Sequence, residues 1–327
     1  MLLLLAIKGV KAGFYIFSIW VINDYIKTLS KILIHDPRPH MVDDRINALS
    51  CSYEYGTPSG HACNSTFIFV LLFLEYNYPF GQEKQKSFAK YLISLILGVS
   101  FIFIMCYDRV YVGVHTIDQL ILGIAIGLWV PLWFHCCYRN SIYKYLESIQ
   151  NTGNRQFFIK VLMASLIFIV IILAPQVLAF VYTDQTFSPP QIWKERLNRN
   201  CIQPPLFNTF HYSGIYYAGS NGVILGAFIG LLIHGRSVHI KAKTYSILQV
   251  IIKYVTLIVI LALCKAIDSL VPFDLPSIYL VLVLKGFIPS FLPGLLSFSI
   301  PDILLDRIIL KMNKLSQVSE PLIEEKS

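Results

Sequence analysis

Long apolar runs separated by short polar segments recur along the whole chain. A helix that crosses a bilayer needs about 20 mainly apolar residues, and runs of about this length lie at residues 13–34, 60–78, 91–107, 116–136, 158–183, 214–234, 247–266 and 277–299. The first run holds Asp24, Lys27 and Lys31 in its second half, which we expect at the membrane interface or facing the bundle interior. The pattern predicts an all-α, multi-pass bundle of about eight transmembrane helices.

The composition agrees with a membrane protein. Of the 327 residues, 55% are hydrophobic and only 14% are charged, and the mean hydropathy is +0.61. A soluble domain carries about a quarter charged residues, so a single water-soluble globule is excluded. The chain is also too apolar for a disordered protein, and too poor in Gly, Pro and Cys for a collagen or a disulfide-dense scaffold.

We expect three segments along the chain. Residues 1–140 form a core with the first four helices, residues 141–315 add further transmembrane helices, and residues 316–327 form a disordered cytosolic tail. The leading stretch of leucines is too short to span a membrane alone. It is interpreted as the end of an upstream helix, with a cleaved signal peptide as the alternative.

Basic residues are concentrated in one set of loops, and this asymmetry predicts an orientation. Most Lys and Arg lie at both termini and in the loops 79–90, 137–157 and 235–246; few lie in the loops 35–59, 108–115, 184–213 and 267–276. Because cytosolic loops carry an excess of Lys and Arg, we expect the second set to face a lumen or the outside. The net charge of +8 is then chiefly a topology signal, and no nucleic-acid partner is expected.

Three clusters of chemically active residues fall on this non-cytosolic face. They are residues 31–39 at the end of the first helix, residues 54–61 at the start of the second, and residues 108–115 between the third and fourth. Lys31, Arg38 and Arg109 supply three cations, which are costly near a bilayer unless an anion lies among them. Two Arg forks and one Lys suit the oxygens of a phosphate group.

The second cluster has the pattern of a helix start. Thr57 is expected as the N-cap and Pro58 at the first helical position, so that the backbone N–H groups of Ser59 and Gly60 point outward. Such free amides at a helix N-terminus bind anions, and Gly60 has no side chain to block their approach.

Two histidines complete the predicted site. His61 and His115 supply imidazoles that serve as nucleophile and general acid near neutral pH. Together with the cations they predict a metal-free phosphoryl-transfer site, in which positioning and charge neutralisation supply most of the rate. No Cys and His spacing in the chain resembles a metal site.

These residues resemble the three signature motifs of the type 2 phosphatidic acid phosphatase (PAP2) superfamily. The motifs are Lys31-x6-Arg38-Pro39, Pro58-Ser59-Gly60-His61 and Arg109-x5-His115, and the likeness is good over residues 25–135. The resemblance implies the family's helical core, shared with vanadium haloperoxidases, and needs no metal or other cofactor. It implies His115 as the nucleophile that becomes phosphorylated and His61 as the acid for the leaving oxygen, with the phosphoryl group held by Lys31, Arg38, Ser59, Gly60 and Arg109.

The chain departs from the family pattern at two positions. Asp108 stands where Ser is usual before Arg109, and we expect it to hold the Arg109 fork by a salt bridge rather than to repel phosphate. Gln119 stands where an Asp usually accepts from the nucleophile's Nδ1–H. Gln119 either orients His115 or only caps the following helix, and Asp118 is a possible substitute for the missing carboxylate.

The substrate class is predicted from finer resemblances. Glu54-Tyr55-Gly56 before the second motif is similar to sphingosine-phosphate and long-chain-base-phosphate phosphatases of the endoplasmic reticulum, whereas Gln119 and Pro-Ser-Gly-His are similar to glucose-6-phosphatases. We expect a membrane phosphatase for a lipid phosphate monoester, with its active site in the endoplasmic-reticulum lumen. The alternatives are a glucose-6-phosphatase-like or dolichyl-diphosphatase-like enzyme, or an inactive protein that keeps the pocket to bind lipids. The membrane helices argue against a haloperoxidase.

Two further features carry expectations. Gly222, Gly226 and Gly230 repeat every four residues and predict close helix packing, with a homo-oligomer face as the alternative. Cys51 and Cys201 lie on predicted non-cytosolic loops and could pair if that compartment is oxidising.

Overall fold

The computed structural model describes residues 2–50, 53–78, 87–151, 155–200, 210–237, 245–272 and 275–319. Every regular element in these ranges is a helix. The helices are α1 (Leu2–Ile34), α2 (Pro39–Val42), α3 (Gly60–Asn77), α4 (Phe88–Tyr111), α5 (Ile117–Trp133), α6 (Arg139–Asn151), α7 (Arg155–Thr186), α8 (Gln191–Asn200), α9 (Phe210–Gly219), α10 (Gly222–Ser237), α11 (Ile247–Ser269), α12 (Ile278–Leu280) and α13 (Ile288–Ser319). Two π-helical segments, Phe134–Tyr138 and Val281–Phe287, lead into α6 and α13.

The predicted helical membrane bundle is confirmed. In the described part of the chain, seven stretches are long and apolar enough to cross a bilayer: Leu5–Val42, Phe88–Tyr111, Ile117–Ile149, Ile159–Thr186, Ser213–Gly235, Ile247–Ser269 and Ile278–Met312. The expected eighth span corresponds to α3, which has 18 residues but carries polar residues at both ends. His61 and Asn64 lie near its start, and Glu75 and Asn77 near its end.

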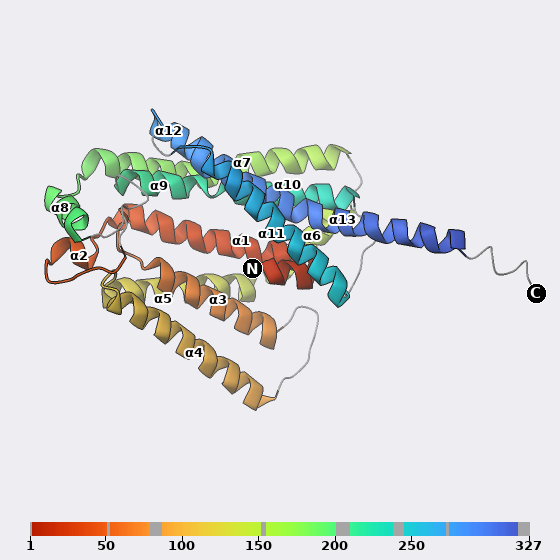
Figure 1. Cartoon of the computed structure of the whole chain (residues 1–327), viewed down its shortest axis with the longest axis horizontal. Helices are drawn as coiled ribbons and strands as arrows, with labels where there is room; N and C mark the ends of the chain where they lie inside the picture. The colour runs from red at the N-terminus through yellow and green to blue at the C-terminus, as the bar shows by residue number, and fades with distance from the viewer. Residues whose placement is uncertain are drawn as a thin grey trace, which may run out of the picture.

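Helix α1 runs through the middle of the bundle (Figure 1). In this view α3, α4 and α5 lie on one side of α1, α7, α9, α10 and α13 lie on the other, and α11 crosses near the N-terminal end of α1 (Figure 1). The backbones of α3 and α5 meet closely, because a Cβ added at Gly123 would lie 2.7 Å from Ser59 O and one added at Gly127 would lie 2.4 Å from Cys63 O. Glycines in α5 therefore bring the start of α3 directly against the start of α5.

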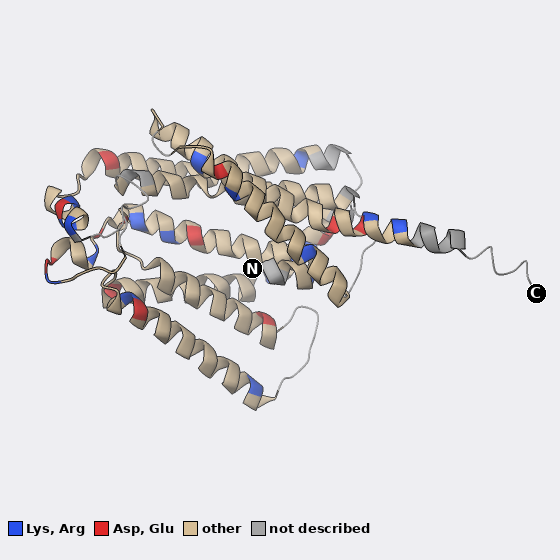
Figure 2. Cartoon of the chain, viewed as in Figure 1, with Lys and Arg blue, Asp and Glu red and all other residues tan. Residues whose placement is uncertain are grey.

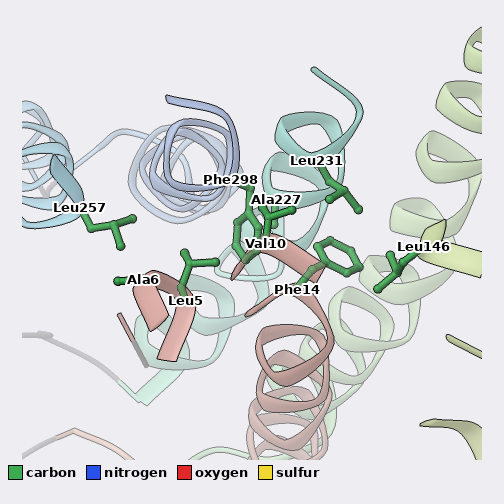
Figure 3. Packing of buried hydrophobic residues seen from close by; sticks show 9 residues of the cluster. All are labelled: Leu5, Ala6, Val10, Phe14, Leu146, Ala227, Leu231, Leu257 and Phe298. Carbon is green, nitrogen blue, oxygen red and sulfur yellow. The ribbon is translucent and has the colours of Figure 1, made fainter. Parts of the chain in front are cut away.

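The N-terminal turns of α1 are part of the core. The helix is kinked at Gly9, where φ is 79°, a value that favours glycine. The kink places Leu5 and Ala6 against Leu257 of α11 and Phe298 of α13 (Figure 3). The last of the leading leucines, Leu5, and the alanine after it thus pack α1 against the C-terminal half of the chain.

The glycine stripe of α10 packs against α13 of the same chain. A Cβ added at Gly222, Gly226 or Gly230 would lie 2.7, 2.1 or 2.5 Å from carbonyl oxygens of residues 287, 291 and 295. Since α13 already covers these glycines, the stripe mediates close helix packing within the chain. The alternative of a homo-oligomer face built on Gly222, Gly226 and Gly230 finds no free surface there, because α13 fills it.

Several predicted loops contain helices. α6 occupies most of the predicted loop 137–157, and α8 lies within the predicted loop 184–213, packed against α2. α13 extends to Ser319, four residues into the predicted tail, and residues 320–327 lie outside the described residues, as do Cys51 and Cys201. Figure 2 shows charged residues gathered mainly towards the two ends of the bundle, with further charged positions along α1.

Candidate phosphate-binding site

The three predicted clusters meet at one end of the bundle, where α1 ends and α3 and α5 begin (Figure 1). Two main-chain hydrogen bonds tie the second cluster to its neighbours: Gly56 N donates to Asp36 O of the first cluster at 2.7 Å, and Ser59 N donates to Gln119 O, in the first turn of α5 after the third cluster, at 2.9 Å. The connectivity of the helices therefore brings together segments that are far apart in the sequence, as the topology predicted.

Lys31 and Arg38 share one internal counter-ion. Both side chains are buried, and the Glu54 carboxylate lies between them, with Oε2 3.1 Å from Arg38 Nη2 and 3.5 Å from Lys31 Nζ. Arg38 Nε also donates to Glu54 O at 3.1 Å, and Lys31 Nζ donates to Tyr55 O at 2.7 Å. Tyr217 of α9 donates its hydroxyl to Glu54 Oε1 at 2.7 Å, which ties this cluster to the C-terminal half.

The surroundings of Glu54 keep it ionised. Burial alone would raise the pKa of this carboxyl, but the charges of Lys31 and Arg38 and the hydrogen bond from Tyr217 lower the pKa to about 2. Sequence reasoning treated Glu54 only as a subfamily marker and missed its role as counter-ion. Among the described residues, the Glu54 carboxylate pairs with both Lys31 and Arg38, so it offsets one of their two positive charges.

Arg109 is held by its neighbour in the sequence. Arg109 Nε donates to Asp108 Oδ2 at 2.8 Å, and Nη2 contacts the same oxygen. The predicted salt bridge between Asp108 and Arg109 is present. Asp108 is more exposed than Arg109, with 42% against 18% of the side chain accessible, so the pair sits at the rim with the arginine turned inward.

The start of α3 differs in detail from the prediction. Ser59, not Thr57, is the N-cap, and its hydroxyl accepts from Ala62 N. The Ser59 N–H is already bound to Gln119 O, so the predicted free amide of Ser59 is wrong. The first amides inside the helix, those of Gly60 and His61, have no acceptor within the helix and remain the candidate donors for an anion.

His115 is buried and its tautomer is fixed. Its Nδ1 lies 3.0 Å from Gln119 Oε1, and because the amide oxygen only accepts, Nδ1 must carry the proton and Nε2 a free lone pair. Burial, reinforced by the charges of Arg38 and Lys31, lowers the pKa of His115 to about 2. The imidazole is therefore neutral at physiological pH, with its lone pair on Nε2.

Gln119 both caps α5 and orients His115. Its Oε1 also accepts from Thr116 N at 3.4 Å, while its Nε2 donates to Asp36 Oδ2 at 2.8 Å and to Pro37 O at 2.9 Å. Two acceptors beside Nε2 leave only one orientation for the amide group. The two readings of Gln119 that the sequence left open are thus both realised.

Asp118 does not reach the histidine. Its side chain is exposed, and within the described residues the partner of His115 Nδ1 is Gln119. Successive helical residues point about 100° apart, so residues 118 and 119 of α5 face in different directions. The prediction that Asp118 substitutes for the usual carboxylate is wrong.

His61 lies at the open side of the site. It is exposed in the first turn of α3, within electrostatic reach of Arg109 and Arg38. The charges of Arg38, Lys31 and His61 in turn act on His115. The site thus combines a buried histidine, an accessible histidine and three cations around one end of α3.

Comparison with known proteins places this site in a family. Residues 12–143 match the sequence profile of the PAP2 superfamily. Over this stretch the chain is similar to the PAP2 superfamily. The matched residues contain all three motifs predicted from the sequence, so that resemblance is confirmed.

Relatives of different substrate classes match the same part of the chain. Sphingosine-1-phosphate phosphatase 2 of Mus musculus is 32% identical over 129 residues, 35% of this chain and 32% of the relative. Lipid phosphate phosphatase delta of Arabidopsis thaliana is 29% identical, over 34% and 27% of the two chains. Glucose-6-phosphatase catalytic subunit 1 of Felis catus is 21% identical, over 45% and 43%. The matched stretch covers less than half of each of these relatives, and no solved structure matches the chain significantly.

Proposed function

We propose that this protein is a membrane phosphatase that hydrolyses a lipid phosphate monoester, a sphingoid-base phosphate or a related lipid, through a phosphohistidine intermediate. One observation carries the proposal. A neutral, tautomer-fixed His115 lies in the field of two buried cations, Lys31 and Arg38, at one end of a membrane bundle. A nucleophile beside fixed positive charge is what transfer of a phosphoryl group requires.

Each motif residue has a role in the proposed reaction. Lys31, Arg38 and Arg109 hold the phosphoryl oxygens, aided by the amide of Gly60. His115 Nε2 attacks phosphorus, so that a P–N bond forms as the P–O bond to the leaving group breaks.

His61 serves both halves of the reaction. It donates its proton to the leaving alkoxide, and it then takes a proton from the water that hydrolyses the P–N bond. The products are the alcohol and inorganic phosphate, and both histidines return to their initial state.

The preference for a lipid rests on the membrane context and on the relatives. Seven apolar spans in the described residues keep the site close to the bilayer, where a phosphorylated lipid presents its headgroup. Two of the relatives are named as phosphatases of sphingosine 1-phosphate and of lipid phosphates. The distribution of basic residues supports a non-cytosolic site, and we propose the lumen of the endoplasmic reticulum.

Two other functions have specific support. Gln119 and the Pro-Ser-Gly-His motif favour a sugar phosphate, in line with the similarity to a glucose-6-phosphatase. The engagement of Arg109 by Asp108 and of Lys31 and Arg38 by Glu54 favours an inactive protein that retains the pocket for lipid binding. A dolichyl-diphosphatase-like activity is the remaining alternative.

The experiment is phosphate release by the purified full-length protein from sphinganine phosphate, phosphatidate, dolichyl diphosphate and glucose 6-phosphate. We expect vanadate-sensitive release from sphinganine phosphate that His115→Ala abolishes. The control His135→Ala changes a histidine in the π-helical segment Phe134–Tyr138, beyond the far end of α5, and should leave release unchanged. Release from glucose 6-phosphate alone would support the sugar phosphatase. Silence on all four substrates with lipid binding retained would support the inactive protein.

A further inference from the structure

Asp36 lies at the centre of a hydrogen-bond network behind the predicted nucleophile. Its Oδ2 accepts from Gln119 Nε2 at 2.8 Å and from Thr57 Oγ1 at 2.5 Å, and its main-chain oxygen accepts from Gly56 N at 2.7 Å. Gln119 Oε1 in turn lies 3.0 Å from His115 Nδ1. A carboxylate, an amide and an imidazole thus form one continuous chain.

The surrounding backbone holds the three hydrogen-bonded side chains in place. A Cβ added at Gly56 would lie 2.4 Å from Gln119 Nε2, so the backbone at residue 56 presses directly on the amide. Pro37 O provides a second acceptor for Nε2 at 2.9 Å. Gln119 therefore has no room to rotate away from either Asp36 or His115.

We propose that Asp36 is a positioning residue that acts on His115 through Gln119 and so replaces the carboxylate that the sequence lacks at position 119. The inference rests on the proposed function, since it assigns a role within that reaction. It differs from the prediction for Asp118, because the carboxylate comes from the first motif and lies two hydrogen bonds away from the imidazole, with the Gln119 amide between them.

The chain of bonds responds to the charge that develops on the imidazole. When His115 Nε2 bonds to phosphorus the ring becomes cationic, and the Nδ1–H bond to Gln119 Oε1 strengthens. The negative charge of Asp36 polarises the amide in the same direction, through the Nε2–H bond. No proton moves along these hydrogen bonds, because His115 Nδ1 and Gln119 Nε2 keep their hydrogens throughout.

A purely structural role makes a different prediction. If Asp36 only braces Thr57 and the 54–59 loop, its removal costs the same factor whatever residue stands at position 119. If it acts through the amide, its effect depends on the charge at position 119. A double-mutant cycle measures this dependence.

The experiment compares kcat for sphinganine phosphate in Asp36→Asn, Gln119→Glu and the double variant. We expect Asp36→Asn to lower kcat by about 10-fold, the lower end of the range for direct hydrogen-bond partners of functional histidines, because Asp36 lies one bond further away. Gln119→Glu alone places a second carboxylate against Asp36, and we expect no increase in kcat. In the double variant a single carboxylate contacts His115 directly, and we expect kcat within about threefold of the original protein, a rescue in the range that coupled neighbours show.

Asp43→Asn is the matched control, because it removes a carboxylate from the same segment, one that pairs with exposed Arg45 and not with Gln119. We expect it to leave kcat unchanged. Equal losses on Asp36→Asn in both backgrounds, or no loss in either, would overturn the proposal.

A second readout needs no turnover. Nitrogen-15 labelling of histidine, with His115→Asn for assignment, reports the Nδ1 proton of His115 by NMR. We expect Asp36→Asn to shift this proton upfield, the double variant to shift it downfield again, and Asp43→Asn to leave it in place. A proton that does not respond to Asp36→Asn overturns the relay. If the protein releases no phosphate from any substrate, the proposed function fails while this series still decides the role of Asp36.

Discussion

Removal of the Glu54 charge is expected to destabilise the empty site and to strengthen anion binding. Glu54→Gln keeps the shape of the side chain but leaves Lys31 and Arg38, 3.5 and 3.1 Å away, without their counter-ion. The two cations then keep neutral acceptors, among them Tyr55 O and the main-chain oxygen of residue 54, but no negative charge. A phosphate-like anion that enters the site supplies the missing negative charge.

The magnitude follows from the pKa of Glu54. The lowering from 4.5 to about 2 corresponds to about 3 kcal/mol of stability at neutral pH. Breaking a buried ion pair by removing one partner costs about 3–5 kcal/mol, so the two routes agree near 3 kcal/mol. If half of this is regained when an anion binds, the Kd for vanadate falls about tenfold.

The assay is thermal unfolding in detergent, with and without vanadate, for the original protein, Glu54→Gln and the control Asp43→Asn. We expect Glu54→Gln to melt at a lower temperature when empty and to show a larger vanadate-induced shift than the other two proteins. An equal vanadate shift in all three would refute the reasoning, because Glu54 would then not compete with anions for the cations.

The pH dependence has a definite sign. Since the folded-state pKa of Glu54 lies below its ordinary value, its contribution is fully present above about pH 4.5 and is lost as the pH falls towards about 2. The difference in unfolding free energy between the original protein and Glu54→Gln should therefore shrink across this window. A difference that grows on acidification would contradict the assignment of Glu54 as the ionised partner.

Three further substitutions test other contacts. Gly56→Ala places a Cβ 2.4 Å from Gln119 Nε2. We expect the free energy of unfolding in denaturant to fall by about 1–3 kcal/mol and kcat to fall with it. An unchanged kcat would mean that the position of Gln119 does not matter for the reaction. Glu75→Gln breaks the ion pair with Arg139, 2.9 Å apart at the end of α3 that lies far from the site. We expect it to lower the free energy of unfolding by about 3–5 kcal/mol and to leave kcat per folded molecule unchanged. A fall in kcat would mean that this ion pair is coupled to the site. Gly226→Ala, whose Cβ would lie 2.1 Å from Phe291 O, should lower the melting temperature by separating α10 from α13, and an unchanged value would count against this packing.

The helical bundle and the meeting of the three motifs were predictable from the sequence. Apolar runs of bilayer length mark helices strongly, and the alternating path of the chain decides which loops share a face. α6 and α8 were missed because they are short and polar, so a scan for apolar runs does not register them. α3 was predicted as a helix, but its polar ends keep it below the hydropathy of the other spans.

The electrostatic detail of the site was not predictable. Glu54 and Asp36 gain their roles from contacts with residues 16 to 163 positions away, such as Arg38, Gln119 and Tyr217. A sequence motif identifies residue types at fixed spacings, but it does not show which charged side chains will lie in contact in the folded protein. The N-cap moved to Ser59 for the same reason, since the Ser59 amide is fixed by Gln119 O, a partner that local sequence does not reveal.

The most direct test of the central claim is to trap the phosphoenzyme. The purified protein is mixed with radiolabelled sphinganine phosphate, quenched in alkali, digested and mapped. We expect an alkali-stable, acid-labile label on the peptide that contains His115, and no label in His115→Ala. Phosphate release that continues in His115→Ala, or a label on any other residue, would contradict the account.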